Sequence, residues 1–500
     1  MDILSWQFAA FTVVVLAIYY LLTRRAQNVW LLLASYVFYL SMAWQYLALL
    51  LLTTVVNYFL AWRIERDVLD RPRPAVGEAA TGGARSLRSR SSPFLSVGLL
   101  WNVAALVLFH LASSTYGQSI FGSDLHLALN PHSIWTRFLF PVGFSFYSLQ
   151  AISYLVDVSR RQVPASRDAL DFALYMAYFP KLTAGPIERA RGFLPALARP
   201  RRVDNQAVTR GLALIVTGLV RKLVIAQTLQ QMISTDLFKS PLSYGGLQLW
   251  GGILAYSFIL YNDFAGYTSI MRGVSALFGL ELNQNFNQPY FSRSFSEFWT
   301  RWHISLSNWL RDYIFFPVSR TLLRRQPNPR HPLNLVVPPL TTMLVSSLWH
   351  GFSLGMVTWG GLHGLYQALE RLVQGSRPRQ SQNRRPALQQ VSSALLTFLL
   401  AMLAWVPFAT NDFSLALQYW KGMVLLGPGV NAFRMPFGWI FAAIGLSLAI
   451  DWAQYHTADD VVFLKWVRPA QAFLLALAVL LVLASLGQAV DVSGFVYQGF

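Results

Sequence analysis

The sequence contains no cysteine, which excludes disulfides, thiolate nucleophiles and cysteine-based zinc or iron–sulfur sites. Charge is also scarce, because Asp, Glu, Lys and Arg make up 12% of the 500 residues, whereas soluble domains carry about 25%. There is no HExxH zinc motif, no GxxxxGK[ST] phosphate loop and no internal repeat. These absences argue against a soluble enzyme and against an inverted-repeat transporter.

Long apolar runs are present instead, and hydrophobic residues make up 54% of the chain. Only helices and closed barrels span a bilayer, and a run of about 20 apolar residues predicts a helix. We therefore predict an all-α polytopic membrane protein with about 11–12 transmembrane helices, in a single embedded domain over residues 1–500. Its basic loops near 63–94 and 371–389 are rich in Pro, Gly, Ser and Arg, which predicts mobile linkers. The apolar runs cover residues 7–22, 29–43, 45–62, 95–112, 138–157, 211–233, 247–270, 334–350, 353–370, 391–408, 436–453 and 470–488.

The net charge of +18 comes from Lys and Arg that are concentrated in alternate loops. Residues 63–94 and 371–389 are strongly basic, whereas residues 113–136 and the tail after 488 contain no Lys or Arg. By the positive-inside rule, this alternation predicts a multi-pass protein of the plasma or inner membrane with both termini outside. We assign the charge to contact with anionic membrane lipids rather than with nucleic acid.

Two segments, 170–191 and 292–320, have basic residues on both sides and cannot cross the membrane once without breaking this alternation. We expect both to form re-entrant or interfacial helices that begin and end on the cytoplasmic side. Irregular backbone at membrane depth is tolerated only beside protein or a water-filled cavity. The two segments therefore indicate a cavity that opens to the cytoplasm.

His350 lies near the middle of a run that has no Asp, Glu, Lys or Arg between Arg330 and Glu370. Ionisable side chains inside a membrane are costly, and they usually mark a pathway or a reaction centre. An imidazole can act as a general base near neutral pH, and burial favours the neutral form that a base requires. His350 is therefore a candidate general base; the alternative is a structural histidine bonded to a neighbouring helix.

His303 is the second candidate, in the segment 292–320. A helix over 299–313 would place this histidine on an aromatic face that a purely interfacial helix does not need. The alternative is a stripe that serves packing alone. The residues on that face are Trp299, Trp302, His303, Leu306, Leu310 and Tyr313.

His363 follows two glycines and precedes a third, Gly364, a pattern typical of close helix packing through small residues. Packing is therefore the preferred interpretation for this histidine. Carboxylates near His303 and His350 are few, so no metal site is predicted.

Several stretches resemble the membrane-bound O-acyltransferase family, in the bacterial branch of alginate O-acetylation and D-alanyl transfer. The resemblance covers most of the chain, and its most specific part is the joint presence of "FWTRWHISLSNWLRDY" and "LWHG". One departure follows "RDYIFFP", where a Gly-Gly turn is usual and this sequence continues "VSRTLLRRQPNPR". The matching stretches are "PVGFSFYSLQAISYLVDVSR", "AYFPKLTAGPIERA", "YNDFAGYTSIMRG", "FNQPYFSRSFSEFWTRWHISLSNWLRDYIFFP" and "LVSSLWHGFSLGMVTWGGLHGLY".

The resemblance implies a ring of tilted helices around a central channel, and an O-acyltransferase that needs no metal or bound cofactor. His350 would be the central catalytic residue and His303 the second. The donor would be a thioester of coenzyme A or of an acidic acyl carrier protein on the cytoplasmic face. An acyl group, acetyl in this reading, would reach a hydroxyl of an extracellular polysaccharide, with a periplasmic or extracellular acyltransferase as a partner. The candidate substrate-binding neighbours are Trp302, Asn308, Arg311 and Trp349.

Two other functions fit the same residues. A transporter or flippase for a lipid-linked or anionic solute would also use a basic inner face and a buried histidine. The lack of an internal repeat and the scarcity of membrane carboxylates argue against it. A scaffold that recruits a separate enzyme is the second alternative, and it predicts that His350 can be replaced without loss of function.

Overall fold

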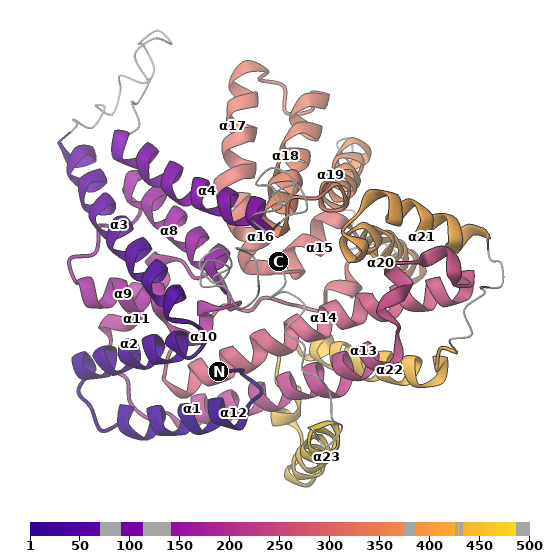
Figure 1. Cartoon of the computed structure of the whole chain (residues 1–500), viewed down its shortest axis with the longest axis horizontal. Coiled ribbons are helices and arrows are strands. Elements are labelled where there is room, and N and C mark those ends of the chain that lie inside the picture. Colours follow the sequence, from indigo (N-terminus) through magenta and orange to yellow (C-terminus); the bar gives the residue numbers. More distant parts are fainter. Residues whose placement is uncertain (71–91, 114–141, 375–385, 426–428, 430–433, 487–500) are drawn as a thin grey trace, which may run out of the picture. The chain divides into compact units, whose positions relative to one another are not determined.

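The computed structural model describes residues 1–70, 92–113, 142–374, 386–425, 429 and 434–486. These residues form helices and no strands, which confirms the all-α class (Figure 1). Each predicted apolar run overlaps a helix. Of the predicted mobile loops, residues 71–91 and 375–385 lie outside the described part, whereas residues 63–69 continue helix α3 (Trp44–Leu69).

Five helical stretches in the described residues are long and apolar enough to cross a membrane. This finding supports a polytopic membrane protein. The total of about 11–12 spans, the central channel, the single domain and the outside position of both termini stay predictions. The five stretches are Trp44–Leu69, Asn205–Met232, Ala387–Thr410, Phe437–Thr457 and Arg468–Ser485.

One compact unit comprises residues 1–203 and 278–280. Within it, α8 packs against both α3 and α4, and α2 packs against α9. The helices of this unit are α1 (Trp6–Tyr19), α2 (Arg24–Leu40), α3, α4 (Pro93–Ser113), α8 (Phe144–Ser159), α9 (Ala169–Ala177), α10 (Phe179–Leu182) and α11 (Ala190–Ala198).

A fully buried lysine, Lys181, lies in the short helix α10 of this unit. Its ammonium donates to the side-chain oxygen of Gln150 and to the carbonyl of Tyr175, and it lies 5.1 Å from the Phe193 ring. Burial lowers the pKa of Lys181 to about 7, and the Glu188 carboxylate partly offsets this effect. The segment 170–191 thus holds a buried cation among short broken helices.

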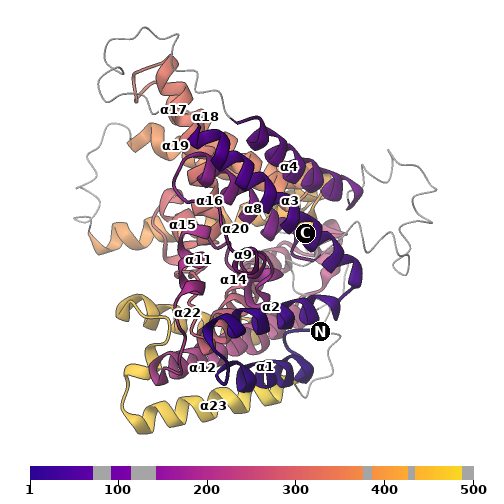
Figure 2. The same ribbon diagram turned by 90° about the vertical axis from the view of Figure 1, so that its left-hand side faces the viewer.

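The second compact unit comprises residues 204–277 and 281–500. Its longest helix, α14, is buried along nearly its whole length, and its polar residues Asn262 and Asp263 are buried with it. Helices α18 and α19 lie side by side, as both views show (Figures 1 and 2). The elements are α12 (Asn205–Leu219), η2 (Val220–Gln227), α13 (Thr228–Met232), η3 (Thr235–Phe238), η4 (Pro241–Ser243), α14 (Gly246–Leu277), η5 (Pro289–Phe291), α15 (Phe295–Arg301), α16 (Ile304–Leu310), η6 (Arg311–Phe315), α17 (Phe316–Arg325), α18 (Pro332–His350), α19 (Leu354–Gln374), α20 (Ala387–Thr410), α21 (Phe413–Leu425), α22 (Phe437–Thr457), η8 (Val462–Lys465) and α23 (Arg468–Leu486).

Two pairs of glycines bring α12 and α14 into backbone contact. A Cβ added to Gly218 would lie 2.6 Å from the carbonyl oxygen of Gly266, and one added to Gly273 would lie 2.5 Å from that of Gly211. Such distances leave no room for a side chain. The small residues therefore set how closely these two helices approach.

The π-helical turn η2 places two buried cations against carboxylates. Arg221 pairs with Asp451 of α22 at 2.5 Å and donates to Asn262 of α14 at 3.0 Å. The next residue, Lys222, pairs with Asp263 of α14. Buried charges require such partners, so η2 is tied to both neighbouring helices.

Candidate active site

His350 is the last residue of α18, and its side chain is only 3% exposed. The ring lies against Trp349 at a centroid distance of 4.7 Å, Trp359 at 5.2 Å and Phe408 at 5.5 Å. The helix ends here because Gly351 adopts an extended conformation, with φ 160° and ψ 159°. The imidazole is therefore held at a helix end, within aromatic side chains that α19 and α20 supply.

The continuous helix predicted over 299–313 is wrong, because α15 and α16 are separate helices that meet at His303. This residue has φ 41° and ψ 55°, in the left-handed region that few residues other than glycine adopt. Asn285 provides the bonds that replace the missing helical ones. Its carbonyl accepts the Ile304 N–H at 2.9 Å, and its side-chain oxygen accepts the Ser305 N–H at 3.1 Å.

Trp349 is in contact with both catalytic candidates. The centroid of its ring lies 6.0 Å from His303 and 4.7 Å from His350, edge to face in each case. His303 is fully buried and also meets the Phe264 ring at 4.8 Å. The structure therefore brings two imidazoles to one indole, one from the junction of α15 and α16 and one from the end of α18.

Trp302 is buried in the same aromatic cluster. Its ring lies 4.9 Å from Trp405, which stacks with Trp359 at 5.9 Å, and Trp359 in turn contacts His350. Of these tryptophans, Trp405 and Trp359 were not predicted from the sequence as part of the site. Trp359 could have been found, because it lies one helical turn before His363 in the uncharged run, but no pattern links Trp405 to this site.

His363 is fully buried among the same rings, at 5.2 Å from Trp359, 5.2 Å from Trp299 and 5.9 Å from Trp405. Within the described part of the chain, neither nitrogen of its ring has a hydrogen-bond partner. The neighbouring Gly360 does serve packing, because an added Cβ would lie 2.6 Å from a backbone oxygen of α18. The glycines therefore explain the helix contact, while His363 itself faces aromatic side chains.

The two polar candidates are less buried than the aromatic rings. Arg311 has a side chain that is 50% exposed and pairs with Asp312 at 3.3 Å. Asn308 is half-buried on α16, the short helix that follows His303. Arg311 is therefore directed at least partly to the surface, and the roles of Arg311 and Asn308 as substrate neighbours stay predictions.

A GxSxG pattern at Gly351–Gly355 was also missed, although hydrolases use it for a nucleophilic serine. That use requires a turn from a strand to a helix, whereas here the pattern joins α18 to α19. The Ser353 hydroxyl donates to Asn411 at 2.5 Å and accepts the Met356 N–H at 3.1 Å. This serine therefore caps the start of α19.

Burial determines the charge of His303. Because desolvation lowers the pKa of His303 to about 3, its imidazole is neutral at physiological pH. A neutral imidazole has one nitrogen that accepts a hydrogen bond and one that donates. No group of three or more His, Asp or Glu side chains in the described ranges is placed to hold a metal ion. The arrangement offers imidazole groups within a cluster of aromatic rings.

Comparison with known proteins assigns this arrangement to a family. A profile of the membrane-bound O-acyltransferases matches residues 9–409. The chain belongs to this family. A similar protein is the probable alginate O-acetylase AlgI of Pseudomonas aeruginosa, 33% identical over 83% of this chain and 73% of that protein. The peptidoglycan O-acetyltransferase of Helicobacter pylori is 28% identical over 81% of this chain and 76% of that protein. The teichoic acid D-alanyltransferase of Streptococcus thermophilus is 31% identical over 45% of this chain and 55% of that protein.

As a membrane-bound O-acyltransferase, the protein is an enzyme that works in a lipid environment and uses an acyl donor. The family needs no metal cofactor. His303, Trp349 and His350 lie within the matched range, whereas α22 and α23 lie beyond it. The transporter alternative receives no support from these relatives.

Proposed function

We propose that this membrane-bound O-acyltransferase moves an acetyl group from a cytoplasmic thioester to a hydroxyl of a cell-envelope polysaccharide. The observation that carries the proposal is the contact of two buried imidazoles, His303 and His350, with the single indole of Trp349. The names of the relatives refer to alginate, peptidoglycan and teichoic acid, which supports an envelope polymer as the acceptor. Two of the three names refer to acetyl transfer.

In this proposal, His350 accepts the proton of the acceptor hydroxyl as its oxygen attacks the carbonyl carbon of the thioester. The carbon–sulfur bond then breaks, and the departing sulfur takes up the proton. His303 orients the donor or relays that proton, because a neutral imidazole can both accept and donate. The proposed neighbours of the substrates are Trp302, Asn308, Arg311 and Trp349.

The charge of α17 supports an anionic donor, either coenzyme A or an acidic acyl carrier protein. Arg320, Arg324 and Arg325 are exposed on this helix, which belongs to the same compact unit as the two histidines. We infer that this face is cytoplasmic, in a plasma or inner membrane, with both termini on the opposite side. A separate acyltransferase outside the membrane would then act on the acyl group or the polymer.

Thioester turnover in proteoliposomes tests the proposal. Labelled acetyl coenzyme A is supplied on the cytoplasmic side to the parent enzyme, to His350→Ala and to His456→Ala, a control at an exposed histidine. Loss of a general base should lower turnover by about 100-fold or more. The control should retain the parent rate, and both variants should keep the parent melting temperature.

The other outcomes are informative. Equal turnover in His350→Ala would remove this residue from the chemistry and make His303 the candidate base. If His303→Asn also kept the parent turnover, neither histidine would be catalytic, and the scaffold alternative would regain support. Transfer to a cytoplasmic acceptor alone would contradict the polysaccharide assignment.

A further inference from the structure

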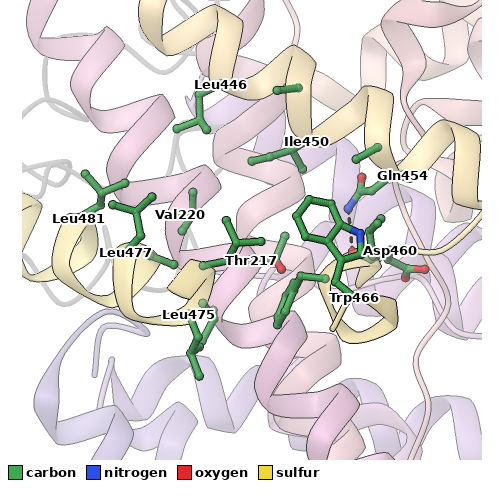
Figure 3. Close-up of a pocket in the computed structure, with 17 residues that line it drawn as sticks. Thr217, Val220, Leu446, Ile450, Gln454, Asp460, Trp466, Leu475, Leu477 and Leu481 are labelled. Carbon is green, nitrogen blue, oxygen red and sulfur yellow. Dashed lines mark hydrogen bonds between the residues drawn. The ribbon is translucent and has the colours of Figure 1, made fainter. Parts of the chain in front are cut away.

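A groove of about 290 Å³ runs along α23, and none of His303, His350 and His363 lines it (Figure 3). It is partly open, and its walls come from α12, η2, α22, α23 and the segment 460–466. Two of these walls, α22 and α23, lie beyond the residues that match the family. The aliphatic side chains that define it are Val220, Leu446, Ile450, Leu477 and Leu481.

The groove has one polar end, formed by Gln454, Asp460 and Trp466 (Figure 3). The Gln454 amide and the Asp460 carboxylate are already engaged within the protein. The Gln454 amide donates to the Asp460 carbonyl at 2.7 Å, and the Asp460 carboxylate pairs with Arg272 at 2.7 Å and with Arg210 at 3.1 Å. A ligand in the groove would therefore meet hydrocarbon along its length, and apolar cavities take apolar ligands.

The helices around the groove indicate where such a ligand comes from. Three of the stretches able to cross a membrane form its walls, namely Asn205–Met232, Phe437–Thr457 and Arg468–Ser485. Only 6% of the last stretch is buried within the protein. Aliphatic side chains that face empty space lose dispersion contacts. A lipid tail, which is as apolar as leucine, would restore these contacts. The hydrocarbon of the bilayer is thus available beside these helices, and it matches the apolar walls of the groove.

The polar end also suits a phosphate. Trp466 is 48% exposed, Arg468 is an exposed cation close by, and the exposed Lys465 reaches the Asp459 carboxylate at 3.1 Å. Tryptophan and basic residues gather at the level of lipid headgroups. We propose that the groove binds one acyl chain of a membrane phospholipid, with the headgroup phosphate at Trp466, beside Lys465 and Arg468.

The same polar end is connected to the buried charges of η2. Gln454 accepts a hydrogen bond from Arg221 at 3.1 Å, and Arg221 is the partner of Asp451. An acyl chain between η2, α22 and α23 would fill the space beside this network. A ligand that binds only the native state raises the stability of that state, so phospholipid should raise the melting temperature.

The experiment uses the full chain purified in detergent, with dioleoyl phosphatidylglycerol as the probe. Native mass spectrometry counts retained phospholipid for the parent, for Ala478→Trp, which fills the groove, and for Leu480→Trp, a control on the same helix that is 63% exposed. The parent and the control should retain one phospholipid and melt several degrees higher when it is added. Ala478→Trp should retain several-fold less and show no rise.

A second measurement needs no substitution. Phosphatidylglycerol with a photoreactive acyl chain should crosslink to the peptides that contain Leu446 and Leu477 in the parent protein. The proposal would be overturned by equal phospholipid retention in all three proteins or by crosslinks confined to other helices. It would also be overturned if the parent protein formed a dimer that retained no phospholipid. Dioleoylglycerol, which lacks a phosphate, should raise the melting temperature less, and an equal rise would overturn the headgroup assignment.

Discussion

At His303, the backbone and the imidazole impose separate requirements on the residue. The left-handed backbone, with φ 41°, is tolerated by asparagine but strained for a β-branched residue, whereas the proposed chemistry needs the ring itself. The two can therefore be separated by substitution. This residue shows how a tertiary contact, here with Asn285, can fix both the fold and the position of a reactive group.

We predict that His303→Asn keeps the fold but lowers acyl transfer by at least about 10-fold, the lower range for loss of an acid–base group. His303→Val should also be less stable than His303→Asn by about 1–2 kcal/mol, because of the positive φ. Turnover and thermal unfolding of both variants check this. Parent-like turnover in His303→Asn would exclude a role for the ring.

Lys181 should make the stability of the protein depend on pH. Its folded-state pKa of about 7 lies below the ordinary value of 10.5, so the unfolded chain binds more protons between these two values. Stability should therefore rise with pH across this window, and below pH 7 the cost of the buried charge is fully present. Lys181→Met should flatten the rise in melting temperature between about pH 7 and pH 10.

The matched control for this prediction is Lys239→Met, which removes an exposed lysine. Its melting temperature should follow the parent curve at every pH. An unchanged slope in Lys181→Met would mean that Lys181 does not lose its proton in the folded protein within this range.

At the scale of helices, the contact between α12 and α14 depends on glycine at particular positions. Gly218→Ala should destabilise the protein, because overpacking costs about 1–3 kcal/mol and exceeds the gain of about 1 kcal/mol in helix propensity. Gly445→Ala on α22 is the matched control, since an added Cβ there meets nothing within 4 Å. Thermal unfolding should show a lower melting temperature for the first variant and an equal or higher one for the second.

The sequence predicts the helices better than their ends and breaks. Apolar runs locate each long helix because bilayer hydrocarbon and a buried core both select the same side chains. The break at His303 could not be predicted, since its cause is the distant Asn285 rather than any Gly or Pro. His350 was visible because it stands alone in an uncharged run, whereas Trp405 reaches the cluster only through the packing of α20.

At the scale of the whole chain, the absence of cysteine makes the predicted orientation directly measurable. Single substitutions Asp2→Cys and Arg377→Cys lie at the N-terminus and in the second basic loop. A membrane-impermeant maleimide should label Asp2→Cys in intact cells and Arg377→Cys only after permeabilisation. The parent chain is the unlabelled control. The reverse pattern would invert the topology and place the basic loops outside.

The two cations of η2 constrain the order in which the chain can enter the membrane during synthesis. A lone Arg or Lys at the centre of a spanning helix costs about 3 kcal/mol during insertion, and Asn205–Met232 contains both Arg221 and Lys222. Asp263 follows soon after on α14, but Asp451 is made only when α22 leaves the ribosome. We therefore expect the cost of burying Arg221 to be offset by a carboxylate only once α22 has been made, so α22 completes the assembly of a helix made much earlier.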